Sequence, residues 1–217
     1  MIVAALGIAL AAWPASAGGI RGTVLLSAEA ASASRRNDRH ALVHAQQGVT
    51  DAVIYLEHVP DNVERRLTGH HWFLPYRNPP MAIIVQSQMH FIPRVLPITA
   101  GSSIRFENED RVYHNAFSVS AAKRFDLGKH PPGRVDTVTF ERTGVVNLHC
   151  EIHPEMVGYV VVVPNHAFTR PDSLGAFELP KLPAGQYVLH AWHPLSGEVT
   201  ARVEMPKHGD AGVQLTF

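Results

Sequence analysis

The segment Cys150-Glu151-Ile152-His153-Pro154-Glu155-Met156 places three side chains that bind soft metal ions, a cysteine, a histidine and a methionine, in one short stretch. Cys150 is the only cysteine of the 217 residues, so no intramolecular disulfide can form. The segment lies between residues 145–148 and 157–163, two apolar runs that predict strands. A tight loop between two strands would bring the three side chains close together.

A second histidine, His114, begins residues 114–119, a stretch that predicts an earlier strand. Two imidazoles and one thiolate in a plane, with a weak and long axial thioether, form a type 1 copper site. His114 and His153 would supply the nitrogens, Cys150 the thiolate and Met156 the axial sulfur. The sequence therefore predicts one type 1 copper ion per chain, held by these four residues.

The same residues could also form a site without a type 1 copper ion, or one in which Met156 is not a ligand. Cys150 could be a buried unpaired thiol, and the axial position opposite Met156 could be weakly occupied or empty. A structural zinc site is disfavoured, because one cysteine with widely separated histidines lacks the close ligand pairing of such sites. A dinuclear copper centre is excluded, since it needs two cysteines.

His149 beside Cys150 raises the question of a second, catalytic copper ion. Position 151 is a glutamate rather than a histidine, and no further histidine follows His114 in its strand. Strand alternation also points His149 away from Cys150. We expect His149 to face outward, where it and Pro154 could take part in docking a partner.

The composition is that of an ordinary globular protein, with 46% hydrophobic and 18% charged residues. Its 19 basic and 19 acidic residues give a formal net charge of zero. There is therefore no electrostatic reason to expect nucleic acid or an anionic membrane as a partner.

Residues 1–17 have the pattern of an export signal. The apolar run 2–13 is shorter than the ~20 residues of a membrane-spanning helix, and Ala15-Ser16-Ala17 forms a cleavage pattern before Gly18. An uncleaved anchor is the alternative, because no lysine or arginine precedes the run. We expect a periplasmic or secreted mature protein without a transmembrane segment.

Most of the chain alternates as strands do, with turn signals about every ten residues. Residues 28–48 predict a surface loop or one short helix, and residues 60–80 a long connection; no helix of convincing length is expected. This pattern favours an all-β sandwich or barrel. The expected strands include 20–26, 52–56, 81–85, 103–107, 114–119, 136–140, 145–148 and 157–163.

Residues 91–163 resemble the cupredoxins, the plastocyanin and azurin group, and the short 150–156 loop is most similar to that of amicyanin. Residues 101–108 match the turn and strand that lead to the first histidine ligand. The resemblance implies a cupredoxin Greek-key sandwich. It also implies that the side chain of Asn115, directly after His114, ties the two ligand loops together.

The two flanks resemble a different fold. Residues 22–24 and 52–56, with 175–177 and 182–187, look like parts of a carboxypeptidase-regulatory-like (prealbumin-like) β-sandwich. The cupredoxin would then be inserted in, or joined to, this second sandwich, a pattern similar to bacterial exported methylamine-utilisation or plastocyanin-like proteins. The expected division is a signal peptide at 1–17, regulatory-like parts at 18–78 and 165–217, and the cupredoxin at 79–164.

These observations predict an electron carrier rather than an enzyme, with a dehydrogenase or cytochrome as its redox partner. Pro154, Met156, Val112 and Tyr113 would surround an apolar docking patch near His153. One alternative is a copper-handling or envelope-interaction module without an electron-carrier role. Another is a nitrite-reductase-like oxidoreductase, which would need a second copper ion per chain.

Overall fold

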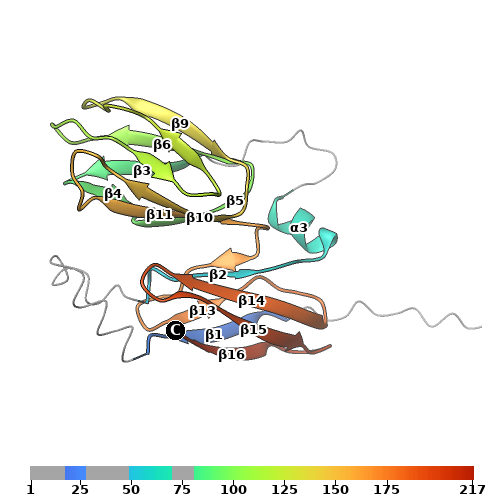
Figure 1. Cartoon of the computed structure of the whole chain (residues 1–217). Helices are drawn as coiled ribbons and strands as arrows, with labels where there is room; N and C mark the ends of the chain where they lie inside the picture. The colour runs from blue at the N-terminus through green and yellow to red at the C-terminus, as the bar shows by residue number, and fades with distance from the viewer. Residues whose placement is uncertain (1–17, 28–48, 70–80) are drawn as a thin grey trace, which may run out of the picture.

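The structure is a computed structural model that describes residues 18–27, 49–69 and 81–217. The expected signal peptide, the expected loop or short helix at 28–48 and the end of the expected connection lie outside these ranges. The described residues form four β-sheets and one short helix, stacked in two layered units (Figure 1). The prediction of an all-β fold is confirmed.

The first unit, here called the central sandwich, consists of β3 to β11. One sheet has the strand order β5-β11-β10-β7-β8 and the other the order β4-β3-β6-β9. The strands are β3 (Ala82–Ser87), β4 (His90–Ile92), β5 (Val95–Thr99), β6 (Ser102–Asn108), β7 (Phe117–Val119), β8 (Arg124–Asp126), β9 (Val135–Phe140), β10 (Gly144–His149) and β11 (Val157–Val163).

Alternating burial explains why these strands form a sandwich. In β6, Ile104 and Phe106 are fully buried while Arg105 between them is exposed. Leu148 of β10 and Val160 of β11 point into the same core from the opposite sheet. Because successive side chains of a strand face opposite sides, each sheet buries one face against the other.

The second unit, here called the outer sandwich, joins segments from both flanks of the chain. β1 pairs with β13 and in parallel with β16, whereas β2 pairs with β12 and β14. The strands are β1 (Ile20–Leu25), β2 (Val53–Leu56), β12 (Phe168–Thr169), β13 (Ala176–Glu178), β14 (Gly185–His193), β15 (Gly197–Met205) and β16 (Ala211–Thr216).

The two sandwiches share a packed interface. Trp192 of β14 lies 5.4 Å, centroid to centroid, from Tyr159 of β11. Beside this apolar contact, Asp51 binds Arg94 at 2.9 Å and Arg170 at 3.4 Å. The interface therefore combines aromatic packing with a charged cluster that bridges the two units.

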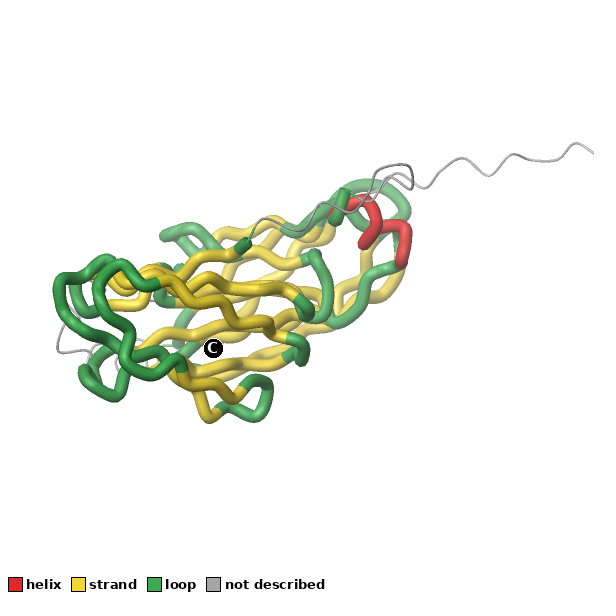
Figure 2. The backbone as a smooth tube through the Cα atoms, turned by 90° about the horizontal axis from the view of Figure 1, so that it is seen from above, coloured by secondary structure: helices red, strands yellow, loops and turns green. Residues whose placement is uncertain are grey.

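The connection expected at 60–80 contains one short helix, α3 (Asp61–Leu67), which lies at one end of the strands (Figure 2). Acidic residues occupy its first turn and basic residues its last turn, which complements the helix dipole. Val63 is the only buried residue of this helix. A helix of seven residues with one buried side chain has no repeating apolar pattern by which the sequence could reveal it. Within the described residues, no helix has the length and apolar character needed to cross a membrane.

Candidate metal centre

The ligand loop is closed by the β10–β11 pair. His149 and Val157 are the last paired residues of these strands, so residues 150–156 form the whole connection. Cys150 directly follows β10, and the Met156 N–H donates to the His153 carbonyl at 3.0 Å within the loop. The antiparallel pairing thus holds the loop at one end of the sheet.

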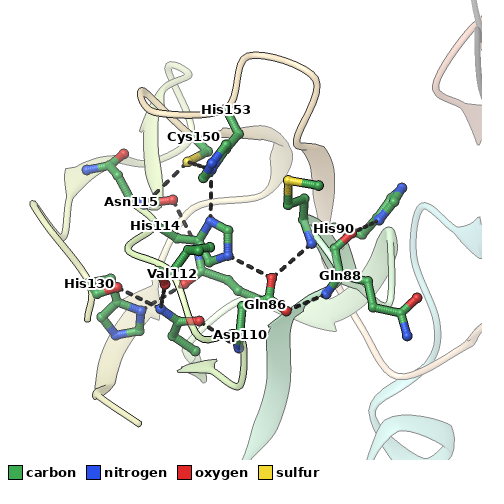
Figure 3. Close-up of polar contacts among 12 residues, drawn as sticks. Gln86, Gln88, His90, Asp110, Val112, His114, Asn115, His130, Cys150 and His153 are labelled. Carbon is green, nitrogen blue, oxygen red and sulfur yellow. Dashed lines mark hydrogen bonds and ion pairs between the residues drawn. The ribbon is translucent and has the colours of Figure 1, made fainter. Parts of the chain in front are cut away.

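Three of the four expected ligands lie together. His114 Nδ1 is 3.0 Å from His153 Nδ1, and Cys150 Sγ is 3.8 Å from the same His153 atom (Figure 3). All three ligand atoms lie within 4.8 Å of one another. In the part of the chain that the structure describes, this is the only group of three or more histidine, cysteine or acidic side chains that could hold a metal ion.

Met156 lies inside the protein near these residues. It is 1% exposed and belongs to the same core cluster as Cys150. This burial contradicts the expectation that Met156 lines an exposed docking patch. It is compatible with an axial sulfur, which remains a prediction.

Asn115 connects the two ligand segments through its backbone. Its N–H donates to Cys150 Sγ at 3.4 Å. Its side-chain amide donates to Asp126 Oδ1 at 2.7 Å and to the Gly128 carbonyl at 3.1 Å, not to the 150–156 loop. The prediction that this side chain joins the ligand loops is therefore wrong, because the backbone amide already fills that role.

His114 precedes its strand instead of lying in it. β7 begins at Phe117, and His114 forms an isolated backbone bridge with His130. Its side chain is 0% exposed, and Nε2 lies 2.8 Å from Asp110 Oδ2. Both ring nitrogens of His114 thus face a defined partner.

A buried polar network that the sequence did not reveal supports this segment. Gln86 donates to the Asn115 carbonyl at 2.9 Å, and its Oε1 lies 2.8 Å from His130 Nδ1. Asn108 Nδ2 donates to the carbonyls of Val112 and His130. Burial lowers the pKa of His130, so its neutral form is favoured. The only sequence signals are a glutamine near the end of an apolar strand and an asparagine at the end of another.

Comparisons with known proteins cover part of the chain. No protein-family model and no curated protein matches it. Among solved structures, it resembles cupredoxins over about two-fifths of its length.

A Cu-containing nitrite reductase (NirK) from Thermus scotoductus SA-01 is 27% identical, with 42% of this chain and 24% of that chain covered and a TM-score of 0.39. An amicyanin mutant in its Cu(I) form is 22% identical, over 39% and 83% of the two chains, with a TM-score of 0.36. A purple cupredoxin from Nitrosopumilus maritimus is 28% identical, over 37% and 98%, with a TM-score of 0.34. The similarity thus spans about a quarter of the nitrite reductase.

Two imidazole nitrogens and one thiol sulfur are the donor types of a trigonal copper site, and all three atoms lie within 4.8 Å of one another. Ligand atoms about 2.0–2.3 Å from one ion lie roughly 3.4–3.8 Å apart at trigonal angles. The distance of 3.8 Å between Cys150 Sγ and His153 Nδ1 agrees with this. The two Nδ1 atoms, at 3.0 Å, would need to separate by about half an ångström, a small shift for rings that now contact each other.

Exposed apolar side chains surround this end of the central sandwich. Val112 and Tyr113, directly before His114, are 47% and 55% exposed, and Ile152 in the ligand loop is 44% exposed. Pro154 is also exposed, whereas His149 is half-buried with its ring 5.7 Å from that of Phe117. Both ligand segments therefore present apolar surface to solvent.

Proposed function

We propose that this chain is an exported type 1 copper protein that transfers electrons through one ion held by His114, Cys150, His153 and Met156. The observation that carries the proposal is the convergence of two imidazole nitrogens and one thiol sulfur within 4.8 Å. Copper would supply reversible one-electron chemistry at these ligands. In this proposal, residues 79–164 form the copper domain and the flanks a regulatory-like sandwich, after removal of residues 1–17.

The residues around the ligands favour electron transfer over catalysis. Cys150 is 3% exposed, and the Asn115 N–H directed at its sulfur stabilises the thiolate that a metal requires. His114 is fully buried, with Nε2 2.8 Å from Asp110 Oδ2 and Nδ1 3.0 Å from His153 Nδ1. Ligands held in this way change little between two oxidation states, which is the property that an electron carrier needs.

The exposed residues Val112, Tyr113, Ile152 and Pro154 supply the docking surface in this proposal. A redox protein, such as a dehydrogenase or a cytochrome, would bind there beside the half-buried His153. An apolar contact of this kind is compatible with the formal net charge of zero, which gives no long-range steering.

The test is the absorption and EPR spectrum of the copper-loaded mature protein. We expect one copper per chain and an intense thiolate-to-copper absorption, which Cys150→Ser abolishes. His149→Ala is the matched control, because it changes the neighbouring residue and should leave the band intact. A band that survives Cys150→Ser would overturn the site assignment, and two copper ions per chain would favour the oxidoreductase.

A further inference from the structure

A carboxylate lies behind His114, on the side away from Cys150 and His153. Asp110 Oδ2 is 2.8 Å from His114 Nε2, while His114 Nδ1 faces His153 Nδ1 at 3.0 Å (Figure 3). A carboxylate accepts hydrogen bonds, so this contact requires the proton of the neutral ring to be on Nε2. Nδ1 is then left with its lone pair directed at the other ligand atoms.

The Asp110 carboxylate is itself held by a strained turn. Ser87 pairs with His90, so Gln88 and Met89 form a two-residue hairpin loop between β3 and β4. The N–H of Gln88 donates to Asp110 Oδ1 at 2.7 Å, and that of Met89 donates to Oδ2 at 2.9 Å. The turn thus donates one hydrogen bond to each oxygen of the carboxylate.

The backbone of this turn adopts an unfavourable conformation. Gln88 and Met89 have φ angles of 53° and 59°, a left-handed region that is unfavourable for a residue with a Cβ. Hydrogen bonds to a charged acceptor are stronger than those between neutral groups, and two of them act on this turn, which offsets the strain. The two N–H donors therefore fix the carboxylate in the direction of His114.

The charge of Asp110 is maintained in this environment. The Gln88 and Met89 N–H groups donate to its two oxygens, and His114 Nε2 lies 2.8 Å from Oδ2, so three polar contacts that favour the carboxylate form surround it. With a side chain 17% exposed, Asp110 is an anion separated from the ligand nitrogen by one imidazole ring. An anionic partner increases the basicity of a metal-bound histidine and favours the more highly charged state of the ion.

We propose that Asp110 is a positioning residue: it fixes His114 with Nε2–H toward the carboxylate and Nδ1 toward the metal, and it thereby stabilises bound copper(II) relative to copper(I). The part about copper rests on the proposed function. The part about the tautomer does not, because it concerns the protein without metal.

The central variant is Asp110→Asn, which keeps the size of the side chain and one acceptor oxygen but removes the charge. Changes to such partners of metal-bound histidines typically cost about 10–100-fold in metal affinity. We expect a loss in this range for copper(II), a smaller loss for copper(I), and therefore a higher reduction potential. A tenfold difference between the two losses corresponds to about 59 mV for a one-electron couple.

Glu109→Gln is the matched control for charge. Glu109 is the neighbouring residue and is exposed, so the variant removes an equal charge from the same segment without touching His114. We expect the affinity for copper(II) and the affinity for copper(I) each to change by less than about twofold. An equal shift in potential for both variants would overturn the proposal, because it would show a general effect of net charge.

Asp110→Asn combined with Met89→Gly controls for damage to the turn. Glycine adopts positive φ angles without strain, so the turn should keep its shape when the carboxylate is gone. We expect the double variant to show the same potential shift as Asp110→Asn. Recovery of the original potential would assign the effect to the turn and overturn the proposal.

Nitrogen NMR of His114 in the metal-free protein separates this inference from the proposed function. We expect the Nε2–H tautomer in the original protein and a mixture of tautomers in Asp110→Asn. A proton on Nδ1 of the original protein would overturn the positioning role whatever the copper result. Failure of the original protein to bind copper would overturn the proposed function and the copper part, while the tautomer would still be measured.

Discussion

The central and the outer sandwich bury different kinds of side chain. Among the described residues, the outer sandwich has an apolar core, and its few buried polar groups, such as Asp51 and Asn165, lie where segments meet. Asn165 donates to the Leu56 carbonyl at 2.8 Å, and Asp51 binds arginines at the interface with the other unit. The central sandwich buries a larger set behind its ligand loops, namely Gln86, Asn108, His114, Asn115, Ser118 and His130.

This difference places most of the buried polar groups beside the three candidate ligands of the central sandwich. A buried polar group without a partner costs about 1–3 kcal/mol, so a fold that needs only stability avoids collecting them. In the central sandwich, Gln86, Asn108 and His130 are bonded to one another or to the backbone around His114. They hold the backbone around His114 in place, whereas the outer sandwich buries a mainly apolar core.

The largest expected effect comes from overfilling the outer core without touching the metal centre. A Cβ at Gly22 would lie 2.2 Å from the Val213 carbonyl oxygen and 2.7 Å from Phe177 Cζ. We expect Gly22→Ala to lower the free energy of unfolding by about 3 kcal/mol, because neighbouring backbone must shift. Chemical denaturation of the metal-free protein measures this loss.

Gly212→Ala is the control for that substitution, since a Cβ there meets nothing within 4 Å. The absorption per bound copper should be unchanged in both variants. A changed spectrum in Gly22→Ala would show that a disturbance of the outer sandwich reaches the metal centre of the central sandwich, although the two units have different cores.

The strands with strong local patterns could be predicted from the sequence. β11 was expected at its observed bounds, because seven residues with five valines have a strong strand preference that burial on both sides satisfies. The convergence of Cys150 and His153 followed from the short loop between two expected strands. Local spacing was sufficient for these features because the contacts are local.

The rest of the site depends on contacts between distant residues. Gln86 and His130 are 44 residues apart, and neither belongs to a motif. The role of Asp110 depends on the turn at Gln88, 22 residues earlier, whose positive φ angles are unusual for these residue types. The strand expected at 114–119 is confirmed for 117–119, but its expected start at His114 is wrong for a related reason: the backbone of His114 bonds to that of His130 instead of extending the strand.

An intermediate effect is expected from removing one member of the buried network. Gln86→Leu keeps the approximate size but leaves the Asn115 carbonyl and His130 Nδ1 without their partner. We expect a loss of about 2 kcal/mol in the free energy of unfolding. Unlike Gly22→Ala, this variant should also change the absorption spectrum, since Asn115 donates to Cys150.

Gln214→Leu, at an exposed position of β16, is the matched control and should alter neither quantity. If Gln86→Leu lowered stability without any change in the spectrum, the network would be a core feature like those of the outer sandwich. The contrast between the two units would then be lost.

The smallest effect is expected in the outer sandwich and only at alkaline pH. The Tyr55 hydroxyl donates to Glu198 Oε1 at 2.5 Å, and burial together with this bond raises the pKa of Tyr55 above its usual value. In the unfolded chain a tyrosine ionises at about pH 10. The contribution of Tyr55 is therefore intact below about pH 10 and is lost as the pH rises beyond it, when only the unfolded chain releases the proton.

Tyr55→Phe keeps the ring that stacks on His190 and removes the ionisable group. We expect the free energy of unfolding of the metal-free protein to fall less steeply above about pH 10 in this variant than in the original protein. Some slope should remain, because burial also raises the pKa of Tyr187. Tyr113→Phe, at a residue 55% exposed in the central sandwich, should follow the original curve. Parallel curves for Tyr55→Phe and the original protein would show that the Tyr55–Glu198 bond does not couple folding of the outer sandwich to pH.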